Sequence, residues 1–174
     1  MKIFFKIQKT NILLLQKKCS FFYKKLDFTN EICRIRLKYN DDGLEHPYFK
    51  LKYVKLLMKA IDYPYEYSGE NSHGLTLKKY KDLDFIFGAT VKQNIVLPGL
   101  VILKNGKYFG PKFTNLYWLL TVLPYDESLL NPNFKINTLH DLKNYILDLI
   151  ELCNKFSDEY IKEIEAGNVP DIEQ

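Results

Sequence analysis

The segment from Thr138 to Gly167 constrains the fold most, because it predicts one long amphipathic helix. Apolar side chains recur through it at three- and four-residue intervals: Leu139, Leu142, Ile146, Leu149, Cys153, Phe156, Tyr160 and Ile164. Thr138, with Asp141 three residues later, is typical of a capping box, and Gly167 suits the residue that follows a helix C-terminus. A helix of this length can span a sheet and project beyond it.

The centre of the chain predicts that sheet. The segments LTLKKY, residues 75–80, and LDFIFGATV, residues 83–91, indicate two strands, with a bulge expected at Gly88 in the second. The second strand places three large apolar side chains on one face: Leu83, Phe85 and Phe87.

The ten residues VILKNGKYFG, Val101 to Gly110, carry lysines around an Asn-Gly pair and suggest either a phosphate-binding loop or a β-hairpin. A phosphate-binding loop needs Ser or Thr directly after its lysine, whereas Tyr108 follows Lys107 here. Asn105-Gly106 suits a type I′ turn, which requires positive φ at both positions. We therefore expect a hairpin, whose first strand begins at Leu100 because the preceding Pro-Gly pair interrupts a ladder.

Two basic segments precede this sheet. EICRIRLKY, residues 31–39, alternates apolar and basic side chains and predicts a strand. Its exposed face carries Arg34, Arg36 and Lys38. Residues 47–61 have apolar side chains at helical spacing and predict an amphipathic helix. Its basic outer face carries Lys50, Lys52, Lys55 and Lys59.

These segments predict one α+β domain over residues 1–174: a mainly antiparallel sheet of about four to six strands, with the long C-terminal helix and two or three further helices packed on it. We expect a peripheral N-terminal helix over 1–18, a short helix over 114–123 and an edge strand over 131–136, NPNFKI. Residues 168–174 are expected to be a frayed tail.

Composition and charge narrow the class of protein. Apolar residues make up 47% and aromatic residues 15% of the chain, which excludes a disordered protein. Residues 1–40 hold ten basic and two acidic residues, a net charge of +8, whereas the remainder has a net charge of −4. A basic arm on an acidic body fits contact with nucleic acid or an anionic membrane, and solvated lysines explain it equally well.

The cysteines and the N-terminus indicate the compartment. Cys19, Cys33 and Cys153 are widely spaced and form no C-x-x-C pair, so we expect buried free thiols in a reducing cytoplasm. Lysines interrupt the apolar start of the chain, and no stretch reaches about 18 apolar residues. We therefore expect neither a signal peptide nor a membrane span.

Three histidines are the candidates for acid–base chemistry: His46, His73 and His140. His73 is the strongest, because the segment DYPYEYSGENSHG, residues 62–74, predicts an exposed loop that also holds Glu66 and Glu70. No nucleophile, metal-ligand, phosphate-binding or dinucleotide-binding signature accompanies them. We expect no catalytic residue, metal or cofactor, and an enzyme centred on His73 remains an alternative.

The same loop is the best candidate for a partner-binding surface. Tyrosine supplies rigid amphipathic contact area, and clustered carboxylates attract a basic protein surface. The candidate residues are Asp62, Tyr63, Tyr65, Glu66, Tyr67, Glu70 and His73. Their alternation also fits a buried strand edge. A second acidic group on the last helix is expected to be an ordinary solvated face: Asp158, Glu159, Glu163 and Glu165.

Residues 87–120 run in the order Gly-Ala-Thr, apolar strand, Gly-Lys hairpin, Gly-x-x-Phe and helix. This order, over about a fifth of the chain, resembles small α+β immunity proteins encoded beside bacterial toxins. The resemblance implies a cytoplasmic, non-enzymatic inhibitor that binds one toxin domain and blocks its active site. If that toxin acts on nucleic acid, its cleft is positive, and the loop with Glu66 and Glu70 would occupy it.

A nucleic-acid-binding module is the alternative from a different class. It would use the basic residues of the N-terminal part, with tyrosines as stacking platforms. These basic residues are Arg34, Arg36, Lys38, Lys52, Lys55 and Lys59.

Overall fold

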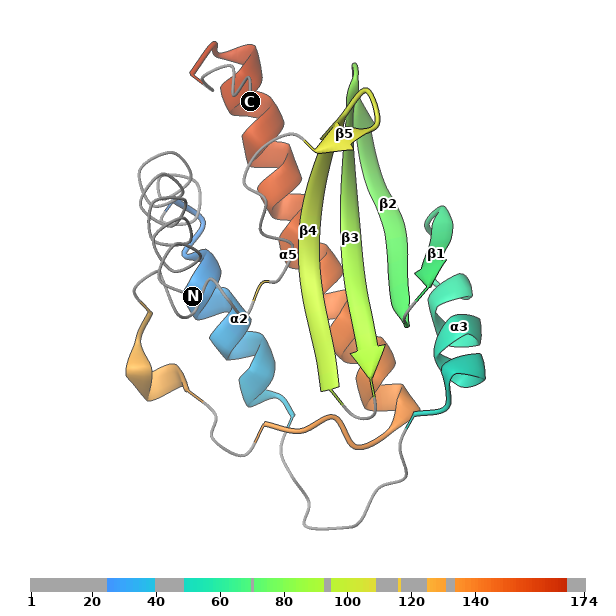
Figure 1. Ribbon diagram of the computed structural model, residues 1–174. Helices are drawn as coiled ribbons and strands as arrows, with labels where there is room; N and C mark the ends of the chain where they lie inside the picture. Colours follow the sequence, from blue (N-terminus) through green and yellow to red (C-terminus); the bar gives the residue numbers. More distant parts are fainter. Residues whose placement is uncertain are drawn as a thin grey trace, which may run out of the picture.

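The computed structural model describes residues 25–39, 49–69, 71–92, 95–108, 116, 125–130 and 134–168. Several sequence-based expectations lie outside these residues: the helix over 1–18, Cys19, His46, Glu70, the end of the tail and, except for Leu116, the helix over 114–123. Within the described part, a five-stranded antiparallel sheet is covered by α-helices (Figure 1). The α+β class with a mainly antiparallel sheet is confirmed.

The sheet is a meander in which each strand pairs with its neighbours in the sequence. Its strands are β1 (Tyr65–Gly69), β2 (Ser72–Tyr80), β3 (Leu83–Lys92), β4 (Ile95–Lys104) and β5 (Lys107–Tyr108). Their order across the sheet is β1-β2-β3-β4-β5, and every pairing is antiparallel. All connections are therefore short hairpins, which require no crossover.

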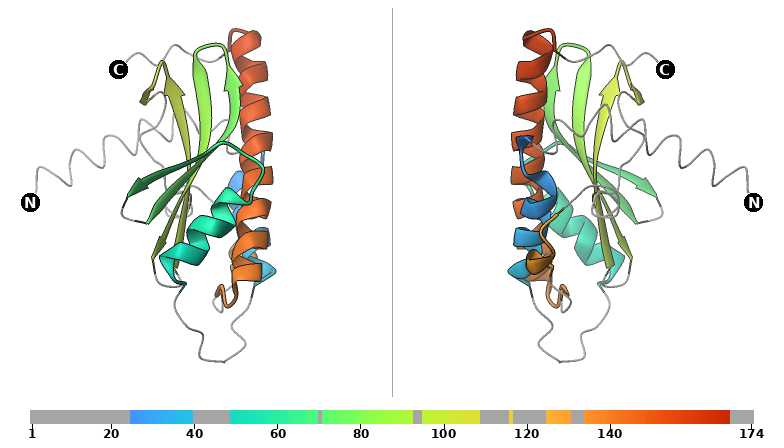
Figure 2. Two further views of the ribbon diagram at one scale, coloured as in Figure 1. Left: turned by 90° about the vertical axis from the view of Figure 1, so that its right-hand side faces the viewer. Right: turned by 90° about the vertical axis from the view of Figure 1, so that its left-hand side faces the viewer.

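The long helix α5 (Leu139–Glu165) covers one face of the sheet, as Figure 2 shows. The predicted face of β3 is buried beneath it, with Phe85 and Phe87 fully buried. The ring of Tyr160 in α5 meets Phe85 edge-on at 6.0 Å between centroids. The helix buries most of its predicted stripe: Leu142, Ile146, Leu149, Cys153, Phe156 and Tyr160.

Both ends of α5 are as predicted. The Thr138 hydroxyl accepts from the backbone N–H of Asp141 at 3.0 Å, and the Asp141 carboxylate accepts from the backbone N–H of Thr138 at 3.2 Å. Gly167 has φ +72°, and its N–H donates to the Ile164 carbonyl at 3.0 Å. The capping box and the glycine at the C-terminus thus satisfy backbone groups that a helix leaves unpaired.

The strand expected over residues 31–39 is wrong, because this segment belongs to helix α2 (Phe28–Leu37). Phe28, Ile32 and Ile35 lie four and three residues apart and are buried together against the core, whereas Leu37 is 43% exposed. Apolar residues at i, i+4 and i+7 share one face of a helix, so burial of this set outweighed the period-2 alternation. α2 packs against α5.

The second basic segment forms α3 (Leu51–Lys59), as predicted for its described part. Val54 and Met58 are buried, and Lys52 and Lys59 lie on the exposed side. α3 packs against α5 and β2, beside β1 (Figure 1).

The β4–β5 hairpin is confirmed, since Asn105 has φ +51° and Gly106 has φ +75°. The expected break before Leu100 is wrong, because β4 runs through Pro98, which pairs with Ala89. Among the described residues β4 is bordered there by β3 alone, and an edge strand is where a sheet tolerates proline. Pairing is regular at Gly88, so the expected bulge is also wrong.

The irregularity of β2 lies between Thr76 and Lys78 instead. Residues 134–136, the described part of NPNFKI, form no strand. Residues 65–69 and 72–74, expected in an exposed loop, are strand residues, so the alternative of a strand edge is the correct one for residues 65–69. Tyr65 is partly buried against the core, whereas Tyr67 is 37% exposed.

Cys33 and Cys153 are buried free thiols, as predicted, and burial raises the pKa of both. No helix of the described segments is long and apolar enough to cross a bilayer.

Candidate functional site

The predicted partner-binding residues do not form one surface. The alternation of β1 turns Tyr65 and Tyr67 toward α3 and places Glu66 on the opposite face of the sheet, opposite Gly74. Tyr63 accepts a hydrogen bond from the Asn154 side chain of α5 at 2.9 Å. Asp62 is exposed beyond the end of α3.

His73 is buried in β2 with 2% of its surface exposed. Its Nδ1 lies 3.1 Å from the Tyr65 hydroxyl, and its Nε2 has no hydrogen-bond partner in the structure. Burial, with a smaller effect of the Lys55 charge, lowers the pKa of His73 to about 4. The imidazole is therefore neutral and shielded from solvent at neutral pH, which does not favour acid–base catalysis on a substrate.

The residues of the predicted basic ladder are dispersed around helix α2. Arg34 pairs with Asp27 at 2.9 Å and with Glu31, and these partners raise its pKa. The guanidinium of Arg36 lies 4.4 Å from the centre of the Phe134 ring, and Lys38 pairs with Asp148 of α5 at 3.0 Å. These contacts tie α2 to its neighbours and leave no row of free cations.

The lysines of α3 behave differently. Lys55 lies 3.5 Å from the centre of the Tyr67 ring, Lys52 lies 4.7 Å from Tyr53, and Lys59 lies 5.8 Å from Tyr65. No carboxylate of the described residues pairs with these three lysines. They form the α3 basic face, which also exposes the Tyr53 ring.

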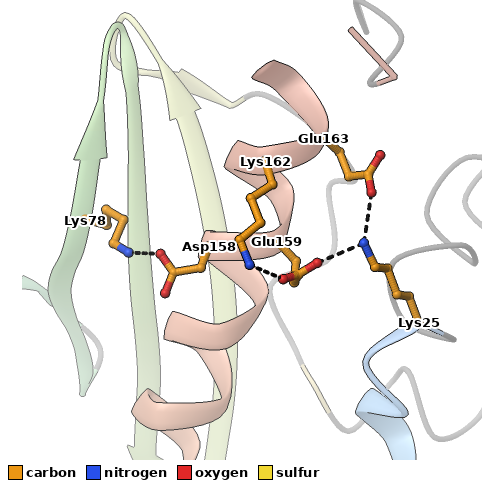
Figure 3. A network of polar contacts seen from close by, with 6 residues as sticks. All are labelled: Lys25, Lys78, Asp158, Glu159, Lys162 and Glu163. Carbon is orange, nitrogen blue, oxygen red and sulfur yellow. Dashed lines mark hydrogen bonds and ion pairs between the residues drawn. The ribbon is translucent and has the colours of Figure 1, made fainter. Parts of the chain in front are cut away.

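The acidic group on α5 is not simply a solvated face. Lys25 pairs with Glu159 at 2.8 Å and Glu163 at 2.9 Å, and Lys162 pairs with Glu159 at 2.6 Å (Figure 3). Lys162 and Lys25 together lower the pKa of Glu159 to about 2. Asp158 pairs with Lys78 of β2, and Glu165 accepts from the Tyr80 hydroxyl at 3.1 Å. This network joins α5 to the sheet and to the start of α2.

The face of the sheet that points away from α5 carries a groove of about 530 Å³, named here the outer groove. Its centre is a row of glycines in register across three strands, because Gly88 pairs with both Gly74 and Gly99. A Cβ built on Gly88 would meet only the Gly99 carbonyl oxygen, at 4.0 Å. Close packing by the described residues therefore does not require glycine at position 88, where the groove is open.

The walls of the outer groove differ in chemistry. Ile86, Val101 and Leu103 supply apolar surface on one side. Ser72, Thr90 and Leu97 lie on the other side, with the two hydroxyls 3.0 Å apart. Glu66 lines the end at β1, is exposed, and pairs with no cation of the described residues.

Edge strand β4 adds exposed apolar side chains beside the groove. Ile95 is 57% exposed and Leu97 is 40% exposed, while the described helices lie on the other face of the sheet (Figure 2). The sequence offered the glycines but not their alignment, which depends on strand register. Gly88 suggested a bulge and Gly99 a strand end, so the groove was missed.

Comparison with known proteins found no matching family model, no similar curated protein and no similar solved structure. The function is therefore inferred from the surfaces of the molecule itself.

Proposed function

We propose that this chain is a non-enzymatic protein-binding module whose partner docks on the outer groove. The observation that carries the proposal is a groove with apolar side chains of β3 and β4, on the sheet face away from the described helices and beside the part of the β4 edge that no described strand covers. Interface centres are depleted in charge, and apolar patches of this kind mark interaction sites. Most described carboxylates on the helices are paired with lysines, whereas Glu66 at the end of the groove is unpaired.

The finer proposal is that the partner is a toxin domain and that the chain acts in the cytoplasm as its immunity protein. It rests on the resemblance of residues 87–120 to immunity proteins. That segment contains β4 and two of the three groove glycines, Gly88 and Gly99. An inhibitor needs no reactive centre, because occupying the partner's active cleft is sufficient.

Co-purification with the product of an adjacent gene tests this proposal. We expect a stable complex in which the activity of the partner is suppressed. Failure of all products of neighbouring genes to bind, at micromolar concentrations, would contradict the immunity role.

Glu66 provides a narrower test of the docking surface. Glu66→Gln removes the charge and keeps the shape, so we expect a severalfold weaker complex if a basic side chain of the partner lies at this end of the groove. Lys79→Gln, which alters an exposed residue paired with Asp84, is the matched control. Equal affinity of all three proteins would remove Glu66 from the interface.

Nucleic-acid binding is a second candidate, which the α3 basic face favours. Lys52, Lys55 and Lys59 remain free of carboxylate partners, whereas Arg34 and Lys38 are engaged in ion pairs. This candidate predicts binding of a single-stranded oligonucleotide that weakens steeply with salt. An electrophoretic shift that is absent at low salt dismisses it.

A further inference from the structure

Strand β1 is held to the molecule by a small group of side chains, named here the His73 cluster: His73, Tyr65, Tyr67, Lys55 and Lys59. The His73 ring lies 6.1 Å from the Tyr65 ring and 5.5 Å from the Tyr67 ring, between centroids. Lys55 of α3 lies over the Tyr67 ring, and Lys59 lies over the Tyr65 ring. The cluster thus connects β1, β2 and α3.

No carboxylate of the described residues acts on His73, and the charged group that does is Lys55. β1 contributes the neutral rings of Tyr65 and Tyr67, β3 places Ala89 opposite His73, and α3 contributes lysines. Glu66 points to the other face of the sheet. The charged side chains of α5 have partners elsewhere: Asp148 with Lys38, Glu151 with Lys155, and Asp158 with Lys78.

Protonation would therefore be costly in the closed structure. Whichever ring nitrogen carries the proton in the neutral form, the imidazolium has an N–H at Nε2, and this atom is buried without an acceptor. A buried charge without a partner and close to another cation is among the most unfavourable arrangements in a protein interior.

Strand β1 can also detach more easily than the longer strands β2, β3 and β4. It is five residues long, pairs only with β2 among the described strands, and its pairing shifts between Tyr67 and Gly69. Edge elements with few buried contacts open with the smallest free energies.

We propose that His73 makes β1 an acid-operated latch: protonation of the imidazole releases β1 from β2, while β3, β4 and α5 stay folded. The latch is a property of the free protein and does not depend on the proposed partner. One consequence rests on the proposed function, because Glu66 and Ser68 line the outer groove and would be displaced with β1.

The pH window follows from linkage. The pKa of His73 is about 4 in the closed state and near its ordinary value of 6.5 once the ring is exposed. The open state therefore binds more protons between these values, and opening becomes more favourable as the pH falls from 6.5 to 4. Opening is expected to increase ~30-fold between about pH 7.5 and about pH 5.

Hydrogen exchange of the free, full-length protein tests the latch. After correction for the intrinsic pH dependence of exchange, we expect the amides of residues 65–69 to lose ~30-fold in protection at about pH 5, and those of 83–104 to change little. His73→Gln cannot be protonated, so its protection should not depend on pH. His140→Gln alters an exposed histidine on α5 and should behave as the wild type.

Two outcomes would overturn the latch. One is an acid-induced loss of protection that persists in His73→Gln, which would assign it to other groups. The other, accessible in the wild type if the variant does not fold, is an NMR titration of the His73 ring with a midpoint near 6.5 and unchanged protection. Either result leaves binding at the outer groove untouched, since no partner is present in these experiments.

Discussion

Substitution of glycine by alanine should have opposite effects at Gly88 in β3 and at Gly106 in the turn between β4 and β5. Gly88 has a backbone conformation open to any residue and free space where a Cβ would lie, so Gly88→Ala should keep or raise the free energy of unfolding by up to about 1 kcal/mol. Gly106 has φ +75°, where a Cβ is strained, so Gly106→Ala should lower it by about 1 kcal/mol. Urea denaturation measures both.

Equal destabilisation by the two substitutions would mean that Gly88 is packed rather than open. That result would also remove the structural basis of the outer groove.

For single residues, the sequence indicated candidate side chains but not the residues that surround them in the fold. His73 was singled out as the strongest acid–base candidate of the three histidines, but its burial depends on β1 and α3 closing over it. The three groove glycines lie in three different strands, and their alignment follows from a register that no single segment specifies.

The α5 helix offers a test at the scale of one element. Thr138→Ala removes the hydroxyl of the capping box and should lower the free energy of unfolding by about 1 kcal/mol, whereas Thr138→Ser should retain it. Chemical denaturation of the three proteins measures the difference. A Ser variant as unstable as the Ala variant would show that the methyl group, rather than the cap, accounts for the loss.

Helix α3 offers a second test, of which face is buried. Met58 is fully buried and Leu56 is 64% exposed on the same helix. Met58→Ala should lower the free energy of unfolding by about 2–5 kcal/mol, and Leu56→Ala by less than about 0.5 kcal/mol. The reverse order in thermal or urea unfolding would mean that α3 is rotated about its axis.

Elements with long or strongly punctuated patterns were predictable from sequence. The apolar residues of α5 share one face only in a helix, so their burial requires that structure. The Asn-Gly pair suits a turn with positive φ at both positions, which is the turn observed. α2 was mistaken for a strand because residues 31–39 fit both periods once Phe28 is left out of the window. The segment of β1 was assigned first to a loop because its Pro and Gly neighbours resemble one, although its alternation also fitted the strand edge that it forms.

Acid stability of the whole molecule should have two separate windows. The His73 contribution is present above pH 6.5 and is lost as the pH falls toward 4, because its folded pKa is lowered. The Glu159 contribution is present above its ordinary pKa of 4.5 and is lost as the pH falls toward 2. Acidification through the first range loosens β1, and acidification through the second weakens the contact between Lys25 and α5.

Lys25→Gln isolates the second window. It removes one of the two cations beside Glu159, so the fall in stability below about pH 4.5 should become shallower. The fall in stability above about pH 4.5, which is assigned to His73, should be unchanged. Denaturation midpoints across the pH range measure this. Added salt should also make the fall in stability below about pH 4.5 shallower, because Lys25 and Glu159 are both partly exposed. A change in stability confined to pH values above about 4.5 would contradict the assignment of the lower range to Glu159.

The arrangement of the whole molecule determines which surface is available to a partner. Helices cover one face of the meander, most described carboxylates of the helices are paired with lysines, and the outer groove and the α3 basic face remain. The sequence predicted the two layers and the long helix, but it directed attention to the charged segment around β1. That segment is divided between the two faces of the sheet.

The dissociation constant of the complex with a neighbouring gene product, measured for matched variants on two surfaces, tests the docking site most directly. Gly88→Val fills the centre of the outer groove with a residue that favours strands, and Lys52→Ala changes the α3 basic face. The proposed function predicts at least a tenfold weaker complex for Gly88→Val and no change for Lys52→Ala, with both variants as stable as the wild type. Unchanged affinity for Gly88→Val, with a weaker complex for Lys52→Ala, would contradict it.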